Sequence, residues 1–344
     1  MRIGFNPIKE DKEIVLKNYH RIIVPVYIPN QEGYFKDSFE ILKLNIESLL
    51  TTIHDKTRIT IYNNNSISIV KNYIDDLYQK HQAIDQVFHS KENLGKINAI
   101  LAGVKGNLEP LITITDSDVF FKHDWQKEVE QTFINFPNAG MISPTPSSKT
   151  IKSFTATNWY FGILGGMSMQ FEDVQDPTAM KKFDDSLGNP TPIYSQAHLD
   201  KYLVLKSKKG KAVMGCGHFV ATLRREVFDK GSDSPAFIKI VGGVENKFID
   251  IPNESLGFLR LATLGNYTYH LGNVKELWME EEFELLKTRK PNVYAENNEL
   301  FVSKPLPKWK IKIGMIFRKL LLSNFFKNGY FRNIGLTAPE NYSL

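Results

Sequence analysis

Two aspartates stand one residue apart in the stretch "LEPLITITDSDVFFKHDW" (108–125). The apolar, mostly β-branched residues before them predict a buried strand. Because a buried charge is costly unless it is paired, Asp116 and Asp118 need a partner at the end of that strand. Two hard oxygen donors suit Mg²⁺ or Mn²⁺, which bind one or two carboxylates together with substrate phosphates. The alternative is a turn in which the aspartates bond to local backbone.

The segments before these aspartates alternate between strand and helix. Short apolar runs predict strands at 21–27, 58–66, 85–90 and 111–115, and apolar residues at helical spacing predict helices at 38–53, 68–81 and 96–106. This alternation predicts an α/β fold with a mainly parallel sheet flanked by helices on both faces. Ligands bind beyond the carboxyl ends of the strands in such sheets. The polar strand ends "PVYIPN", "YNNNS" and "DSD" should therefore converge at one site.

The regular alternation stops at about residue 140. The segment 151–210 mixes short apolar pieces with Gly, Pro and Lys. Residues 212–231 predict a strand that leads into a short helix, and 253–265 predict an amphipathic helix that ends at Gly265. A strand or extended segment is expected at 266–273.

Composition places the chain among ordinary globular proteins. It has 344 residues, of which 42% are hydrophobic and 24% charged, enough for one large α/β domain with an appendage. The single cysteine, Cys216, excludes an internal disulfide and fits a reducing compartment. The first residues lack the apolar core of a signal peptide, and no run of about 18 apolar residues could span a bilayer. We therefore expect a cytoplasmic protein.

Positive charge is concentrated near the C-terminus. Residues 301–336 contain eight Lys or Arg and no Asp or Glu, whereas the whole chain carries a formal net charge of only +5. Such local charge predicts a local partner and does not indicate a nucleic-acid-binding protein. Within 306–331, one helical stripe joins apolar residues flanked by aromatic ones: Ile313, Ile316, Phe317, Leu320 and Leu321, with Trp309, Phe325, Phe326 and Tyr330 around them.

This basic amphipathic segment predicts a C-terminal helix that contacts an anionic membrane from the side, because cations and interfacial aromatic residues favour such surfaces. The alternative is a helix that packs on the catalytic domain and leaves its lysines in solvent. Both interpretations stay open at the level of sequence.

Four segments, in this order and spacing, resemble family 2 glycosyltransferases of the GT-A fold, a Rossmann-like α/β fold within the nucleotide-diphospho-sugar transferase superfamily. They are "RIIVPVYIPNQEGYFKDSFEILKLNIESLL", "ITIYNNNS", "NLGKINAI" and "ITDSDVFF". Later, "GCGHFVATLRREVFD" is similar to the segment beneath the acceptor site. The resemblance implies a catalytic domain at 1–300, with a nucleotide-sugar half at 20–125 and an acceptor half at 126–300, followed by a basic extension at 301–344.

The resemblance also assigns roles to individual residues. It implies that Asp116, Asp118 and His270 hold the metal, Mn²⁺ or Mg²⁺, with Asp118 as the more direct ligand. It implies a nucleotide site, for a UDP-sugar above all, formed by Pro25, Tyr27, Asn63, Asn64, Gly95, Lys96, Asp116 and Ser117. Side-chain amides can both donate to and accept from a uracil-like edge, and a helix N-terminus with a lysine suits phosphate.

The catalytic base is less clearly marked in this sequence. The stretch "NESLGFLRLATLG" resembles the helix that usually opens with Glu-Asp, but here the pair is Asn253-Glu254. Glu254 therefore falls at the position of the family's catalytic Asp, with Asp250 and Glu245 as nearby alternatives. An inverting transferase needs one such base within reach of the acceptor hydroxyl.

These observations predict a metal-dependent, inverting glycosyltransferase that moves a sugar to a hydroxyl of a saccharide or a lipid-linked glycan. A nucleotidyltransferase is an alternative, although it would normally carry a Gly-rich loop after the first strand, where "PVYIPNQEGYFK" has one Gly. A non-catalytic nucleotide- or carbohydrate-binding protein that keeps the sheet is a second alternative. A Rossmann dehydrogenase is disfavoured because no G-x-G-x-x-G follows the first strand.

Overall fold

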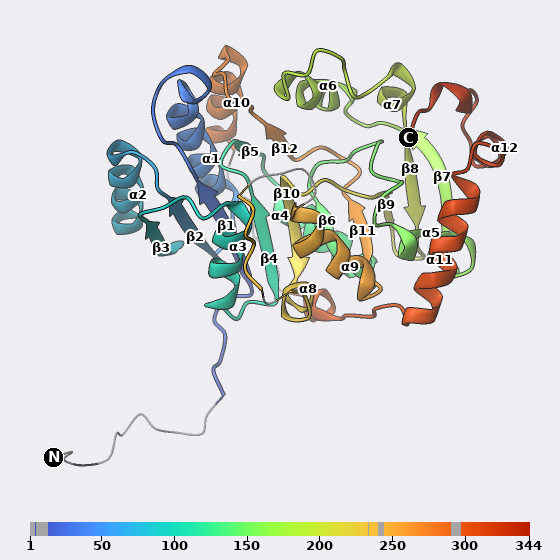
Figure 1. Ribbon diagram of the computed structural model, residues 1–344, viewed down its shortest axis with the longest axis horizontal. Coiled ribbons are helices and arrows are strands. Elements are labelled where there is room, and N and C mark those ends of the chain that lie inside the picture. Colours follow the sequence, from blue (N-terminus) through green and yellow to red (C-terminus); the bar gives the residue numbers. More distant parts are fainter. Residues whose placement is uncertain (1–3, 5–12, 233, 240–243, 290–296) are drawn as a thin grey trace.

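The computed structural model describes residue 4 and residues 13–232, 234–239, 244–289 and 297–344 (Figure 1). Its centre is a ten-stranded sheet in the order β3-β2-β1-β4-β10-β6-β11-β9-β8-β7. The strands are β1 (His20–Val26), β2 (Thr57–Asn64), β3 (Ile84–Ser90), β4 (Leu111–Thr115), β6 (Ala139–Ser143), β7 (Ser168–Asp173), β8 (Lys201–Lys206), β9 (Lys211–Met214), β10 (Val220–Arg224) and β11 (Leu259–Ala262). A two-stranded sheet joins β5 (Val119–Phe121) to β12 (Thr268–His270).

Helices cover both faces of the sheet (Figure 1). They are α1 (Ser38–Thr52), α2 (Ser68–Lys80), α3 (Lys96–Lys105), α4 (Trp125–Asn135), α5 (Ala156–Ile163), α6 (Pro177–Ser186), α7 (Gln196–Asp200), α8 (Arg225–Asp229), α9 (Ile251–Ser255), α10 (Leu277–Lys287), α11 (Lys308–Leu321) and α12 (Lys327–Asn333). Single turns stand at η1 (Gly33–Phe35), η2 (Asn246–Asp250, a π-helix), η3 (Asn298–Phe301) and η4 (Pro339–Asn341).

The N-terminal part of the sheet follows the predicted alternation. Strands β3, β2, β1 and β4 are parallel to one another. Successive residues of β1 point to opposite faces, so Ile22 packs with Leu42 and Ile46 of α1, whereas Ile23 packs with the cluster around α3. A strand buried on both faces is mostly apolar, which is why Ile22, Ile23 and Val24 follow one another without polar alternation.

The remaining strands make the sheet mixed. β10 lies antiparallel between β4 and β6, and β11 is parallel to β6. Beyond β11, the strands β9, β8 and β7 form antiparallel pairs. The segment 151–210, which showed no regular pattern, thus contributes an antiparallel edge to the sheet.

Two predicted elements differ in the structure. The helix predicted at 253–265 is wrong, because α9 ends at Ser255 and residues 259–262 form β11. Gly257 causes the change of direction: its φ is +85°, and a Cβ there would lie 2.0 Å from the carbonyl oxygen of Leu306. A short apolar run can form either a helix or a fully buried strand. Here it forms a strand because it pairs with β6 on one side and β9 on the other.

The strand predicted within 212–231 is two strands. β9 and β10 are separated by Gly215, whose φ of +85° turns the chain away from β9. They do not pair with one another, because β6 and β11 lie between them. The short helix that follows is present as α8.

The C-terminal segment forms α11 and α12 along one side of the molecule (Figure 1). The helix α11 packs closely on α5, and Gly314 permits this approach because a Cβ would lie 2.0 Å from the carbonyl oxygen of Ala156. Ile311 is buried at this contact. No helix in the described ranges is long and apolar enough to cross a membrane.

The apolar stripe predicted for α11 is only partly correct. Ile313, Phe317 and Leu321 pack against buried clusters of the domain, whereas Ile316 and Leu320 remain exposed. The helix therefore has an inner face on the core and a separate outer face, because residues 313, 317 and 321 follow one helical row and 316 and 320 the next.

Candidate active site

The carboxyl ends of β1, β2 and β4 converge on one cavity of about 400 Å³. This confirms the convergence that the polar strand ends predicted, since parallel strands end at the same edge of a sheet. The predicted site residues in its lining are Pro25, Tyr27, Asn64, Lys96, Asp116, Ser117 and Asp118. The lining also contains Glu245, the residue directly before η2.

Asp116 and Asp118 form the corner between β4 and β5. The backbone N–H of Asp116 donates to the carbonyl of Phe219 at 2.8 Å, and the carbonyl of Asp118 accepts from the N–H of Leu271 at 2.7 Å. Because β5 pairs with β12, His270 is opposite Val119, and its Nε2 lies 3.5 Å from Asp118 Oδ2. The structure therefore places His270 beside the aspartate corner, as expected from the sequence.

Asp118 has the properties of a metal ligand. Its Oδ1 is buried and has no hydrogen-bond partner among the described residues. Burial raises the pKa of this carboxyl, and the charge of His270 opposes the rise. Two carboxylates with an adjacent imidazole form a donor set that Mn²⁺ or Mg²⁺ accepts. The residues present fit a divalent metal.

Lys96, at the first position of α3, neutralises the corner from the other side. Its Nζ lies 2.5 Å from Asp116 Oδ1 and 2.7 Å from Glu245 Oε1. Burial alone would lower the pKa of Lys96, but these two carboxylates raise it, so the ammonium is charged. A partly buried cation at a helix N-terminus is suited to bind a diphosphate.

The two asparagines at the end of β2 hold neighbouring loops. The amide of Asn64 donates to Asn93 Oδ1 at 2.9 Å, and its oxygen accepts from the N–H of Leu94 at 2.8 Å. The amide of Asn63 contacts His89 Nδ1 at 2.9 Å, and Asn63 is outside the cavity lining. Asn64 thus shapes the cavity directly, whereas Asn63 supports its surroundings.

Gly95 is fixed by backbone geometry at the start of α3. Its φ is +86°, a region that favours glycine, and a Cβ would lie 2.8 Å from the backbone of Lys239. The N–H of Gly95 donates to Asn93 Oδ1 at 2.9 Å. This glycine lets the 93–95 turn lie against the 234–239 segment, so that Lys96 reaches the cavity.

A chain of charged groups extends from the cavity into the core. His218 Nε2 lies 3.1 Å from Glu245 Oε2, and its Nδ1 lies 3.2 Å from Asp250 Oδ2. The fully buried Asp250 is also paired with Arg260 at 3.1 Å. Although burial alone would lower the pKa of His218, the two carboxylates raise it to about 9. Burial opposes ionisation of Glu245 too, but His218 and Lys96 lower its pKa to about 2.

Residues 22–231 match the model of a protein family described as Glycosyl transferase family 2. The chain belongs to glycosyltransferase family 2. It is a glycosyltransferase, and the mixed sheet with its aspartate corner is the GT-A fold that this membership implies.

Individual relatives of this glycosyltransferase are distant. A 128-residue stretch, 36% of this chain, is 28% identical to ceramide glucosyltransferase 3 of Caenorhabditis elegans and spans 28% of that protein's length. Among solved structures, S. aureus TarS (residues 1–349) is 12% identical, with a TM-score of 0.45, over 94% of this chain and 77% of that chain. The mannosyltransferase PcManGT from Pyrobaculum calidifontis, in complex with GDP-Man and Mn²⁺, is 13% identical, with a TM-score of 0.44, over 94% and 76%.

Glu254 of the glycosyltransferase does not line the cavity. Its Oε1 accepts from the backbone N–H of Ala156 at 2.8 Å and from Arg318 of α11 at 2.6 Å. Glu254 therefore joins α9 to α5 and α11. These contacts keep the carboxylate of Glu254 outside the cavity, and the role of base that its position in the sequence suggested stays a prediction.

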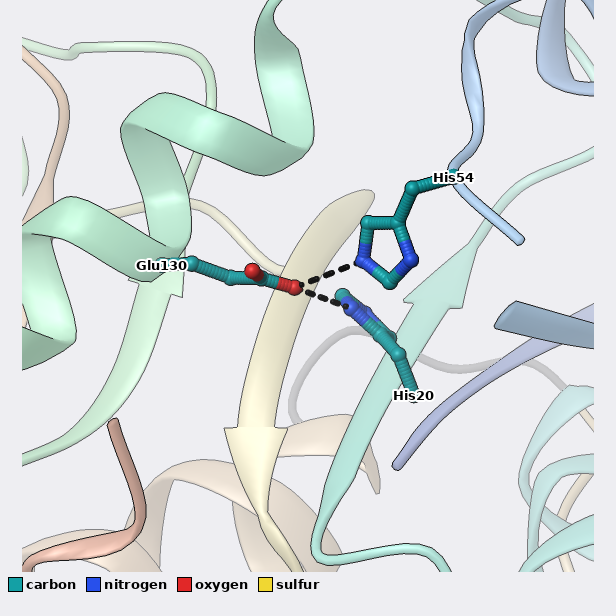
Figure 2. A group of neighbouring side chains, drawn as sticks. All are labelled: His20, His54 and Glu130. Atoms are coloured by element: carbon teal, nitrogen blue, oxygen red, sulfur yellow. Dashed lines mark hydrogen bonds and ion pairs between the residues drawn. The ribbon is translucent and has the colours of Figure 1, made fainter. Parts of the chain in front are cut away.

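A polar cluster that sequence reasoning missed lies at the opposite, N-terminal edge of the sheet. Glu130 Oε1 is 3.1 Å from His20 Nδ1 and 3.0 Å from His54 Nε2, and all three residues are buried (Figure 2). Two imidazoles and a carboxylate in this arrangement could in principle hold a metal ion. The only sequence signal is His20 at the start of a strand, and nothing in it indicates the other two residues.

The hydrogen bonds of this cluster favour a structural role in the glycosyltransferase. The N–H of Lys56 donates to His54 Nδ1 at 3.2 Å, so the proton of a neutral His54 is on Nε2, directed at Glu130. A metal at Nε2 would displace that proton and break the network. Tyr19 and Gln126 complete it by contacting Glu130 and His20. The cluster thus links β1, the α1–β2 loop and α4.

Proposed function

We propose that this glycosyltransferase moves a sugar from a nucleotide-diphosphate donor, a UDP-sugar in the first place, to an acceptor hydroxyl with inversion at the anomeric carbon. The supporting observation is that the aspartate corner, Lys96 and a carboxylate from the acceptor half all line one cavity. Anion-binding groups and a proton acceptor within one site are what such a transfer requires.

In this proposal the donor lies along the ends of β1 and β2. Pro25, Tyr27 and Asn64 form the side of the cavity where the nucleoside would bind, and Tyr27 is about one-third exposed, at 37%. Lys96 at the N-terminus of α3 would bind the diphosphate. Ser117 lies between the two aspartates at the cavity wall.

Asp116, Asp118 and His270 would hold Mn²⁺ or Mg²⁺. The metal, when bound, would offset the negative charge that develops on the leaving diphosphate. The carboxylates also set the electrostatics of the site without it, because Lys96 is held between Asp116 and Glu245.

We place the catalytic base at Glu245, in preference to Glu254 and Asp250. Of the three carboxylates, only Glu245 lines the cavity. Asp250 is fully buried and paired with Arg260 and His218, and Glu254 is bound by Arg318. Asp250 instead positions the base, since it orients His218, which in turn contacts Glu245.

The proposed reaction is a single displacement at the anomeric carbon. The acceptor oxygen forms a bond to the anomeric carbon, while the bond from that carbon to the diphosphate oxygen breaks and its electron pair leaves with the diphosphate. The acceptor proton passes to a carboxylate oxygen of Glu245. Ionisation of Glu245 at neutral pH is ensured by the neighbouring Lys96 and His218, which lower its pKa to about 2.

We further propose a cytoplasmic enzyme that acts on a saccharide or a lipid-linked glycan at the inner face of the membrane. Similarity over 128 residues to a protein named ceramide glucosyltransferase supports a lipid-bearing acceptor. The exposed, basic helix α11 supports a location at the membrane surface.

Calorimetry tests the donor site. UDP should bind the wild type more tightly with Mn²⁺ than with excess chelator, because metal and diphosphate bind cooperatively. Asp118→Asn should remove this difference, while Asp76→Asn, a change of an exposed aspartate on α2, should keep it. Equal UDP affinity with metal and with chelator would contradict the metal site.

Slow hydrolysis tests the chemistry. Wild-type enzyme incubated with a panel of UDP-sugars should release UDP, whereas Asp118→Asn should release almost none. UDP binding without any hydrolysis or transfer would favour a non-catalytic nucleotide-binding protein. Incorporation of a nucleotide into product, with pyrophosphate released, would instead favour a nucleotidyltransferase.

A further inference from the structure

The outer face of α11 is as apolar as the face that packs on the core. Trp309 is 61% exposed and Ile316 65%, and Met315 and Leu320 are exposed beside them. Trp309, Ile316 and Leu320 lie on the side of the helix away from Ile311 and Gly314, which contact α5, and Met315 lies at the edge of that side. A helix on the surface of a soluble domain normally carries polar residues on its outer face. Packing on the domain therefore explains only one of the two apolar faces.

The turn after α11 continues this surface. Phe325 is 86% exposed, and its ring lies 4.8 Å from that of Phe326, which is also exposed. We define the α11 outer face as the exposed residues of α11 and this turn: Trp309, Lys312, Met315, Ile316, Lys319, Leu320, Phe325 and Phe326. A helix of 14 residues is about 21 Å long, so this is an extended surface rather than a single exposed side chain.

The charge on the α11 outer face has one sign. Lys312 and Lys319 are interspersed with its apolar residues, and Lys308 lies at its beginning. No Asp or Glu occurs anywhere between residues 301 and 336. The nearest carboxylates along the chain are Glu299, which is paired with Lys209 at 2.7 Å, and Glu340, which is paired with Arg332 at 3.7 Å. The surface therefore combines exposed aromatic and aliphatic groups with uncompensated cations.

We propose that the α11 outer face lies on an anionic lipid bilayer, with α11 parallel to the membrane plane. Tryptophan and phenylalanine insert at the boundary between headgroups and acyl chains, and lysines bind anionic headgroups. A second copy of the chain is a poorer partner, because a symmetric pair of these faces would place Lys312 and Lys319 against the same lysines. An anionic membrane supplies apolar acyl chains for the exposed side chains of this face and negative headgroups for its lysines.

The inner face of α11 stays on the domain in this arrangement. Arg318 remains bound to Glu254, and Gly314 remains against α5. Docking therefore requires no release of the helix, and it places the whole domain beside the bilayer. The membrane surface adds to the proposed function the place where the enzyme would meet its acceptor, and in that respect it rests on that function. Lipid binding itself does not depend on sugar transfer.

Co-sedimentation with vesicles tests the surface. The full chain should pellet with vesicles of phosphatidylcholine and phosphatidylglycerol, should stay in solution with phosphatidylcholine alone, and should be released in part by high salt. Trp309 should show a blue shift of fluorescence on binding, and Trp309→Phe should lose it. A protein that ignores the anionic vesicles would overturn the proposal.

Variants of the α11 outer face separate its two components. Ile316→Ser with Phe325→Ser should abolish pelleting, and Lys312→Gln or Lys319→Gln should each weaken partitioning about fivefold, the equivalent of about 1 kcal/mol. Matched controls are Leu285→Ser, an exposed leucine on α10, and Lys208→Gln, an exposed lysine in the β8–β9 turn. Both should pellet like the wild type.

Two further readouts keep the result interpretable. Since the changed side chains are exposed, all variants should melt at the wild-type temperature, and their hydrolysis of a UDP-sugar without vesicles should be unchanged. Loss of hydrolysis in the wild type would thus count against the proposed function and leave the membrane surface standing. If size-exclusion chromatography instead shows a dimer that Ile316→Ser dissociates, the face joins two copies and the membrane proposal is wrong.

Discussion

His218 lies between two carboxylates, with Nε2 3.1 Å from Glu245 Oε2 and Nδ1 3.2 Å from Asp250 Oδ2. One carboxylate lines the cavity and the other is buried against Arg260. The histidine thereby connects the proposed base to a fixed charge in the core. Rigid support of this kind holds a reacting group in place at little entropic cost.

The pKa of His218 predicts a dependence of stability on pH. Its folded-state pKa is raised from 6.5 to about 9 by Asp250 and Glu245, against the effect of burial. The stabilisation is therefore complete below about pH 6.5 and is lost as the pH rises through 9. His218→Gln should lower the melting temperature most at pH 6 and hardly at all near pH 10. The same change at the exposed His81, after α2, should have a small effect at every pH. Equal losses for His218→Gln at both extremes would count against the charge pairing.

Exchange of Glu245 for Gln should identify the base. We expect transfer to fall by about two to four orders of magnitude, the usual contribution of a general base, while UDP binding changes much less. Glu254→Gln should keep turnover and lower the free energy of unfolding, because it weakens the contact with Arg318. Steady-state kinetics and thermal melts on the two variants separate these roles. A dead Glu254→Gln enzyme with a normal melt would return the base to Glu254.

Gly95→Ala should damage the donor site through the backbone. The φ of +86° and the approach to Lys239 leave no room for a Cβ, so we expect destabilisation of about 1 kcal/mol or more and a raised KM for the donor. Gly106→Ala, at the other end of α3, is the matched control. Its φ is −86°, and the nearest atom to a Cβ would be 3.9 Å away. Similar losses in both variants would contradict the assignment.

The cluster of His20, His54 and Glu130 should stabilise the fold. Glu130→Gln should destabilise the protein by about 1–3 kcal/mol, the usual cost of weakening the hydrogen bonds of a buried charged group. Although burial opposes ionisation, His20 and His54 lower the pKa of Glu130 to about 2. The stability it supplies is therefore present above about pH 4.5 and lost as the pH falls toward 2.

Acid unfolding followed by circular dichroism measures this loss, and Glu130→Gln should shorten the pH range over which the fold survives. Thermal melts with added Zn²⁺ provide the second test. We expect no rise in melting temperature that depends on Glu130, whereas a clear rise, absent from Glu130→Gln, would show that the cluster is a metal site.

The sequence by itself determined the parallel half of the sheet and the position of the aspartates. Local apolar runs and their periods identify β1, β2, β3 and β4 with their helices, because each element there satisfies its own hydrophobic pattern. Strand ends in a parallel sheet meet at one edge, so the sequence predicts that Tyr27, Asn64 and Asp116 lie together.

The tertiary structure decided the strands beyond residue 140 and which of the candidate carboxylates reaches the cavity. Residues 259–262 form a strand because they pair between β6 and β9 in the sheet. Gly257, with its positive φ, turns the chain so that these residues reach that position. With the helix ended there, Glu254 faces Arg318, and Glu245 faces the cavity. Contacts between residues 64 positions apart leave no trace in a local pattern.

The same limit applies to α11. Its sequence shows an apolar stripe and a basic one, but not which apolar residues the domain covers. Packing of Gly314 on Ala156 sets the rotation of the helix, and that rotation buries Ile311 while it exposes Ile316 and Trp309. Helix periodicity gives the relative positions of side chains, and only a neighbouring surface determines which of them remain in contact with water.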